Sequence, residues 1–353
     1  MIIKKHMYSA IALLAGAVSA FAQGTLVPPL KAFDGSGAPA PIMKTLEQIE
    51  PRRLISSLPY TITNSGSYYV AGNLVGTNGQ HGIVINADNV QLDLNGFALM
   101  GRTNEMAATN LTLTGIEISD DPIHKSITIR NGVVFNWGRY GIRSTLAEDC
   151  RIEDVTVNSN GGTNSFDGMS LGAGWIVSGC RVQDNKGDGI STTGNCMIHK
   201  TIIKDNHLNG LNLAGEAVVA DCTSSSNLKD GIVVGNSSIV RDCLVINNST
   251  NGIVAGDGCL IRNNNCSYNG GGAGIRAGYS CRIDSNHLRS NQTGVKITDG
   301  ASKSIVLRNT AVWNGGGTAN YDLTTDTVYG QILTSEDLGG GFTNHNPWAN
   351  FSL

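Results

Sequence analysis

The sequence predicts an all-β solenoid, in which short strands stack coil upon coil along one axis. Glycine contributes 45 of the 353 residues, whereas only 15% are charged, a composition that suits many short strands and tight turns. A Gly followed by an aliphatic residue or Met recurs along the chain, every 21 residues from Gly168 to Gly252. Apolar residues between these glycines alternate at short spacing, as expected for strands with one buried face.

The first residues have the features of an export signal. Lys4 and Lys5 precede the apolar run "MYSAIALLAGAVSAF", and a small-x-small pattern ends at Ala22. The run is too short to span a bilayer. We therefore expect a signal peptide over residues 1–22 and an exported chain, periplasmic, extracellular or at the cell surface, with no membrane span after signal removal. Residues 23–57 are rich in Pro, Gly and Ala and predict an extended arm with one short helix.

The repeat predicts a single domain over residues 58–335. An interval of about 21 residues suits one coil of a parallel β-helix, in which neighbouring coils lie about 4.8 Å apart and no coil buries its inner face alone. We expect ten to twelve coils, with residues 336–353 as a closing segment. Each coil glycine is expected to allow a left-handed turn before the next strand.

An asparagine recurs a few residues before each coil glycine from Gly141 onward. In a stack of coils these side chains are expected to form a ladder at one bend. Each amide would bond the backbone of neighbouring coils, which the bend removes from the sheet. The predicted ladder consists of Asn136, Asn160, Asn185, Asn206, Asn227, Asn248, Asn269 and Asn291.

Several stretches carry a family resemblance. They are the entry segment "MKTLEQIEPRRLISSLPYTITNSGSYYVAGNL", the first full coil "GIVINADNVQLDLNGFALMG", the 21-residue coils and the closing "NPWANF". Together they resemble the right-handed parallel β-helix repeat proteins of the pectin-lyase-like superfamily, and most of all uncharacterised exported bacterial members. The resemblance implies a single-stranded, right-handed parallel β-helix. It also implies that polysaccharides are the substrates or ligands to consider first.

All eight cysteines lie between residues 150 and 281. Counted from the asparagines, Cys222 and Cys243 hold one position in adjacent coils, and Cys259 and Cys281 hold another. A Cα separation of about 5 Å permits a disulfide, and export permits oxidation. The alternative is a row of buried thiols that act as small hydrophobes. No Cys-x-x-Cys pair occurs, so no metal site is predicted from the cysteines.

The sequence carries no catalytic set typical of polygalacturonases. The segment "DDPIH", which ends at His124, resembles the Asp-Pro-His element of mannuronan epimerases but has an extra residue. Asp221 and Asp242 share one outward position, beside Arg241 and Arg262, and predict a solvated ion-pair network. Asp and Asn also recur before the coil glycines, where they favour turns. Stacked carboxylates are able to recruit Ca²⁺, but no cofactor or metal is expected.

The aromatic residues suggest a binding site in the early coils. The motif "NWGRYG" puts Trp137, Arg139 and Tyr140 at a bend, and an insertion in the next coil adds Phe166. Exposed aromatic rings stack on sugars; alternatively, Trp137 packs beneath the longer loops. Insertions in a solenoid tend to carry its function. We therefore expect any glycan site at this corner.

Two functions remain open at this stage. The first is a non-catalytic exported protein that binds a glycan or forms a structural or adhesive rod. The second is a polysaccharide lyase, hydrolase or epimerase acting on uronate-rich glycans. The formal net charge of −3 gives no electrostatic reason to expect a nucleic acid partner.

Overall fold

The computed structural model describes residues 50–102, 113–298, 303–317, 319–337 and 346–353. The chain divides into two compact units, Met1–Pro51 and Arg52–Leu353. The signal peptide, the short helix of the arm and most of the first unit lie outside the described residues. The rest of the description concerns the second unit, in which no described helix is long and apolar enough to cross a membrane.

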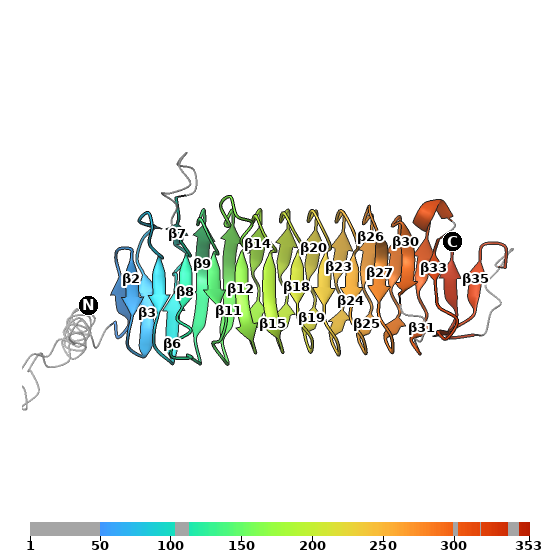
Figure 1. Ribbon diagram of the computed structural model, residues 1–353, viewed down its shortest axis with the longest axis horizontal. Helices are drawn as coiled ribbons and strands as arrows, with labels where there is room; N and C mark the ends of the chain where they lie inside the picture. Colours follow the sequence, from blue (N-terminus) through green and yellow to red (C-terminus); the bar gives the residue numbers. More distant parts are fainter. Residues whose placement is uncertain (1–49, 103–112, 299–302, 318, 338–345) are drawn as a thin grey trace, which may run out of the picture. The chain divides into compact units, whose positions relative to one another are not determined.

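The unit Arg52–Leu353 is a parallel solenoid of stacked coils (Figure 1). One face is a 12-stranded parallel sheet, so the coils number about twelve among the described residues. Its strands are, in order, β2 (Tyr60–Ile62), β5 (Ile83–Ile85), β8 (Ile116–Ile118), β10 (Ile142–Ser144), β12 (Met169–Ala173), β15 (Ile190–Gly194), β18 (Leu211–Leu213), β21 (Ile232–Val234), β24 (Ile253–Ala255), β27 (Ala273–Ala277), β30 (Thr293–Ile297) and β33 (Tyr321–Asp322).

The other two faces form one 24-stranded sheet, because two long strands run through the bend between them. The strands of the second face are β1 (Arg53–Ile55), β3 (Gly66–Val70), β6 (Val90–Asp93), β9 (Thr128–Phe135), β11 (Arg151–Asn158), β13 (Ile176–Ser178), β16 (Met197–His199), β19 (Val218–Ala220), β22 (Ile239–Arg241), β25 (Leu260–Arg262), β28 (Arg282–Asp284), β31 (Ile305–Leu307) and β34 (Val328–Tyr329). The long strands β9 and β11 continue into the third face, whose other strands are β4 (Leu74–Val75), β7 (Ala98–Met100), β14 (Arg181–Gln183), β17 (Ile202–Lys204), β20 (Thr223–Ser225), β23 (Leu244–Ile246), β26 (Asn265–Ser267), β29 (His287–Arg289), β32 (Thr310–Val312), β35 (Ile332–Thr334) and β36 (Asn350–Ser352); one 3₁₀ helix, η2 (Asn314–Gly317), follows β32.

The register keeps equivalent residues of successive coils in line. Ile190 pairs with Leu211, which pairs with Ile232 and then Ile253. All four side chains are fully buried. One apolar column therefore runs through the solenoid, and each coil covers the apolar interior of the coil before it.

The regular coils bend at three places by a common device. A residue in the left-handed conformation is followed by a side chain that turns inward. At the first bend, Asp205 has a φ of 55° and Asn206 follows it. The Oδ1 of Asn206 accepts the backbone N–H of Asn185 at 3.1 Å, while its Nδ2 donates to the carbonyl of Val182 at 3.3 Å. The predicted ladder therefore exists from Asn160 to Asn291, and it continues through Asn314 and Asn320.

Asn136 was predicted as a rung of this ladder, and that prediction is wrong by one residue. Asn136 takes the left-handed position, with a φ of 61°. Trp137 is the residue that turns inward, since its backbone N–H donates to Asn160 Oδ1 at 3.0 Å. Residues 136–138 and 160–162 both read Asn–x–Gly in the sequence. Only the backbone conformation shows that Asn136 precedes the inward position, whereas Asn160 holds it.

The second bend carries a further ladder that the sequence reading missed. It runs through Asn264, Asn286, Asn309 and Asn350, joined by the same amide-to-amide bonds. In earlier coils the equivalent inward position holds Cys222 and Cys243. Asn264 bonds the coil of Cys243, since its Oδ1 accepts the Cys243 N–H and its Nδ2 donates to the Val240 carbonyl, both at 3.0 Å. The spacing of 22 and 23 residues between Asn264, Asn286 and Asn309 was the available signal.

The coil glycines do not allow left-handed turns, contrary to the expectation. None of them is among the residues with positive φ. A Cβ added at Gly189 would lie 2.5 Å from the carbonyl oxygen of Gly210 and 2.8 Å from Asn206 Nδ2. Glycine is required there because the next coil approaches too closely for any side chain.

The solenoid begins and ends beyond the expected boundaries of 58 and 335. Strand β1 already pairs with β3 through Arg53 and Tyr68. At the other end, β36 pairs with both β32 and β35. The closing segment therefore contributes a strand to the third face, and its Asn350 ends the second ladder.

Candidate functional site

Trp137 is fully buried, at 0% exposure. The prediction that it forms an exposed platform for sugars is therefore wrong, and the ring belongs to the buried core. The indole Nε1 donates to the carbonyl of Leu99 at 3.1 Å. The ring lies against Gly82 and Gly115, where an added Cβ would come within 2.6 and 2.9 Å of it. The residue turns inward because it holds the ladder position of its coil.

The other three predicted residues do come together on the surface. The rings of Tyr140 and Phe166 lie 5.0 Å apart between centroids, at a tilt of 59°. The guanidinium carbon of Arg139 lies 5.9 Å from the centre of the Phe166 ring. Arg139 is exposed, and no described carboxylate forms an ion pair with it. We call Arg139, Tyr140 and Phe166 the first corner.

A polar cluster that the sequence reading missed borders the first corner. It lies on the outer face of β8 and β10, where Glu117 pairs with Arg143. Arg143 also reaches Asp120 at 3.4 Å. His81 precedes β5, and its Nδ1 faces Glu117 Oε2 at 3.8 Å. Glu117 and Arg143 each lie two residues after a coil glycine, so the repeat register was the signal that could have found them.

Two atoms of this cluster are buried without a hydrogen-bond partner among the described residues. They are His81 Nδ1 and Glu117 Oε2. Buried polar atoms in native structures are normally bonded, and the exceptions gather where water, an ion or a ligand completes the site. The two atoms face each other at 3.8 Å.

Burial shifts the proton affinities of the cluster. Burial, together with the charges of Arg139 and Arg143, lowers the pKa of His81, so its imidazole is neutral at pH 7. Burial raises the pKa of Glu117, while the Arg143 guanidinium acts against that rise. Burial and the charge of Asp167 raise the pKa of Tyr140, whose phenol stays protonated. The cluster therefore holds a neutral base beside a protonated phenol and two permanent cations.

The "DDPIH" segment is held mainly by its neighbouring coils, and its Asp120 also reaches Arg143 of the cluster. His124 is buried, and its ring nitrogens contact Asp88 at 3.1 Å and Asn86 at 2.9 Å. Asp120 accepts the backbone N–H of Thr145 at 3.1 Å and that of Leu146 at 3.2 Å. Both of these polar residues are held by the neighbouring coils.

The acidic rows of the later coils are also held by neighbouring coils. Asp188 Oδ1 accepts the N–H of Asn209 at 2.7 Å, and Asp230 Oδ1 accepts that of Asn251 at 2.8 Å. These residues form an outer ladder that fastens the turn before each coil glycine. Asp242 pairs with Arg241 at 2.8 Å, while Arg241 and Arg262 are register partners. Among the described residues, no three His, Cys, Asp or Glu side chains converge in a metal-binding group.

All eight cysteines are free and buried. Cys222 and Cys243 are in neighbouring coils, and each thiol donates to a carbonyl of its own bend, at 3.2 and 3.1 Å. Cys259 and Cys281 hold the corresponding place at another bend. Burial raises the pKa of Cys150 to about 11 and that of Cys180 to about 12, so these two thiols are protonated at neutral pH.

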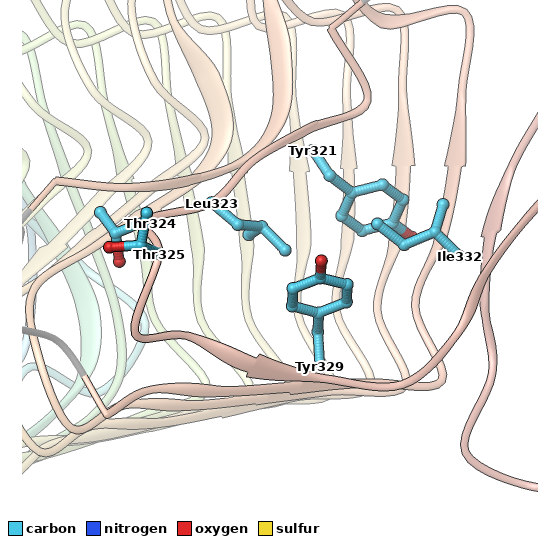
Figure 2. A pocket seen from close by; sticks show the side chains of 6 residues that line it. All are labelled: Tyr321, Leu323, Thr324, Thr325, Tyr329 and Ile332. Atoms are coloured by element: carbon cyan, nitrogen blue, oxygen red, sulfur yellow. The ribbon is translucent and has the colours of Figure 1, made fainter.

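A separate cavity of about 350 Å³ opens at the C-terminal end of the solenoid, between two tyrosines, Leu323, Ile332 and two threonines (Figure 2). The Tyr321 hydroxyl is within hydrogen-bond distance of the Asn309 and Phe351 carbonyls, at 2.8 and 3.0 Å. The lining contains no carboxylate, imidazole or cation. This cavity is the open end of the apolar core.

Two family models match the chain. The model for a right-handed β-helix region matches residues 114–260. The chain has the right-handed parallel β-helix fold that this model describes. A model named for a periplasmic copper-binding protein, NosD, matches residues 211–352 of this β-helix protein. Copper sites are built from imidazole and thiolate ligands, and the described residues bring no three such side chains together. No curated protein matches the chain.

Solved structures share the fold of this β-helix protein. The A-module of a mannuronan C-5 epimerase from Azotobacter vinelandii is 14% identical, with a TM-score of 0.61, over 78% of this chain and 88% of that one. A periplasmic alginate epimerase, solved as a double mutant, is 14% identical, with a TM-score of 0.53, over 76% and 75%. The tailspike of Escherichia coli bacteriophage HK620, in complex with a pentasaccharide, is 9% identical, with a TM-score of 0.55, over 86% and 72%. At these identities the likeness concerns the fold alone.

Proposed function

We propose that this is an exported protein that binds an acidic polysaccharide at the first corner. The observation that carries the proposal is the exposed Arg139, which lies beside the Phe166 ring without a carboxylate partner. An arginine stacked on a ring keeps its in-plane N–H donors for a carboxylate. The Tyr140 and Phe166 rings supply a surface on which a sugar ring stacks.

Charge supports an acidic ligand over a neutral one. Arg139 and Arg143 both lie close enough to His81 to lower its pKa. Glu117 and Asp120 neutralise Arg143 in part. Arg139 keeps its charge available, which favours a uronate carboxylate at that point. Epimerases of alginate and a tailspike bound to a pentasaccharide are among the proteins that share the fold.

A second candidate function is proton transfer on the bound uronate, as in a lyase or an epimerase. His81 favours it, because its side chain is 30% exposed and lies 3.8 Å from Glu117. A neutral imidazole is able to take the proton next to a uronate carboxylate, and a protonated phenol such as that of Tyr140 is able to return one. Arg139 would then stabilise the charge that develops on the carboxylate.

The test is a panel of polygalacturonate, alginate and neutral glucans, incubated with the protein with and without Ca²⁺. Calorimetry measures binding, while absorbance of unsaturated ends and proton NMR measure chemistry. Binding of polyuronates without a new product supports the binding function. An unsaturated or epimerised product establishes the catalytic one instead. Equal affinity for neutral glucans and polyuronates would contradict both, since it would leave Arg139 without a role.

A further inference from the structure

Another aromatic–arginine cluster lies on the first bend of the last coils. It consists of Tyr268, Arg289 and Trp313. The guanidinium carbon of Arg289 lies 5.5 Å from the centre of the Tyr268 ring and 5.2 Å from that of the Trp313 ring. Tyr268 is 48% exposed and Trp313 is 62% exposed. Two large apolar rings therefore face solvent on either side of one cation.

The backbone at these two aromatic residues is unfavourable for large side chains. Tyr268 and Trp313 have φ angles of 58° and 53°. The same row of other coils holds short polar residues, such as Asp205, Ser226 and Asn247, at similar angles. The left-handed conformation suits asparagine and aspartate but disfavours bulky residues. Residues held in rare backbone conformations gather at ligand sites, so the choice of aromatic rings here calls for a role beyond the turn.

The charge of Arg289 is available, unlike that of a similar arginine on the second bend. Arg308 lies 5.2 Å from the centre of the Trp348 ring, but its Nε donates to Asp284 Oδ1 at 2.7 Å. Arg289 has no carboxylate partner among the described residues. Its position between two rings leaves the N–H donors at its edge free for an anion.

We propose that Tyr268, Arg289 and Trp313 form a second binding surface, for a carboxylated polysaccharide that runs across successive coils. The two rings belong to coils two apart, a distance of about 9.6 Å along the stack. A sugar chain laid in this direction contacts one ring, then the arginine, then the other ring. The carboxylate of the middle sugar pairs with Arg289, while its neighbours stack on Tyr268 and Trp313.

The test uses calorimetric titration of the full mature protein with hexamers of galacturonate and mannuronate, and with maltohexaose as the neutral comparison. The variants are Trp313→Asn, Tyr268→Asn and Arg289→Gln. Asparagine suits the left-handed backbone, so the first two variants should melt at or above the wild-type temperature. The matched control is Trp348→Ala, which removes an exposed ring from an arginine that is already paired.

In an Arg139→Gln background, which isolates this surface from the first corner, we expect each of the three variants to weaken binding of a uronate hexamer at least tenfold. The Trp348→Ala control should bind as its parent does, and maltohexaose should not bind. Undiminished uronate affinity in Trp313→Asn and Arg289→Gln overturns the proposal. A change in sedimentation without a change in binding also overturns it, in favour of contact between copies. If Trp313→Asn weakens uronate binding and Arg139→Gln does not, only the proposal for the first corner is refuted. The two proposals therefore fail separately.

Discussion

The first bend differs between the early coils and the regular coils, although the backbone follows the same path. In a regular coil, Asn227 holds the ladder position and Asp230 precedes the coil glycine. Asn227 accepts the Asn206 N–H at 3.1 Å, and Asp230 accepts the Asn251 N–H at 2.8 Å. In the early coil the same two positions hold Trp137 and Tyr140.

This comparison shows why a regular coil is a poor place for a site. Its polar side chains fasten one coil to the next, so few remain for a ligand. In the early coils the buried Trp137 takes over the packing by apolar contact. On the outer face of the same coils, His81 Nδ1 and Glu117 Oε2 have no hydrogen-bond partner among the described residues. The first corner therefore lies where the polar ladder is interrupted.

The largest expected effect on stability comes from replacing Trp137, the apolar residue that holds a ladder position. Trp137→Ala deletes a fully buried indole and leaves a cavity between Gly82 and Gly115. We expect the free energy of unfolding to fall by about 3–5 kcal/mol, measured by urea denaturation followed by circular dichroism. Arg139→Ala, two residues away and exposed, is the control, with a change of less than about 0.5 kcal/mol. Similar losses in both variants would contradict the burial of Trp137.

The next effect concerns the polar ladder of a regular coil. Asn206→Ala leaves the Asn185 N–H and the Val182 carbonyl without their partners. We expect a loss of about 1–3 kcal/mol, the usual cost of leaving buried polar groups unpaired. The exposed Lys229→Ala should change stability by less than about 0.5 kcal/mol. If the two variants unfold at the same urea concentration, the ladder does not hold the coils together.

The smallest effect is the pH dependence of uronate binding at the first corner. His81 has a lowered pKa and faces Glu117, Arg139 and Arg143. It is neutral at pH 7 and gains a proton only below its ordinary value of about 6.5. A bound uronate favours the protonated form, so binding should take up a proton and strengthen as the pH falls from 7.5 to 5.5. The expected gain is about two- to fivefold, equivalent to about 0.5–1 kcal/mol for a partly exposed pair.

The matched variant for this pH effect is His81→Asn, which removes the titrating group. Its affinity for a galacturonate hexamer should be nearly constant between pH 7.5 and 5.5. Calorimetry at three pH values measures both proteins. If the wild-type affinity weakens on acidification, the assigned role of His81 is contradicted. The pH dependence would then come from protonation of the ligand's own carboxylates.

The sequence was sufficient for the fold and for part of the candidate site. The 21-residue spacing identified the coils, and the ladder from Asn160 to Asn291 followed from it. The exchange of Asn136 and Trp137 was not predictable from spacing, because an outward left-handed residue and an inward one are neighbours in the chain. His81, Glu117 and Arg143 lie in three different coils. Their contact depends on side-chain reach across the sheet, which the repeat register suggests but does not determine.

The most direct test compares two cations at the same position of the coil. Arg139 and Lys229 each lie two residues before a coil glycine, and both are exposed. Arg139 borders the interrupted ladder, whereas Lys229 borders the continuous one. Calorimetric titration with a galacturonate hexamer should show affinity lowered about tenfold in Arg139→Gln and unchanged in Lys229→Gln. Equal affinities in the two variants would contradict the claim that Arg139 binds a uronate at the first corner.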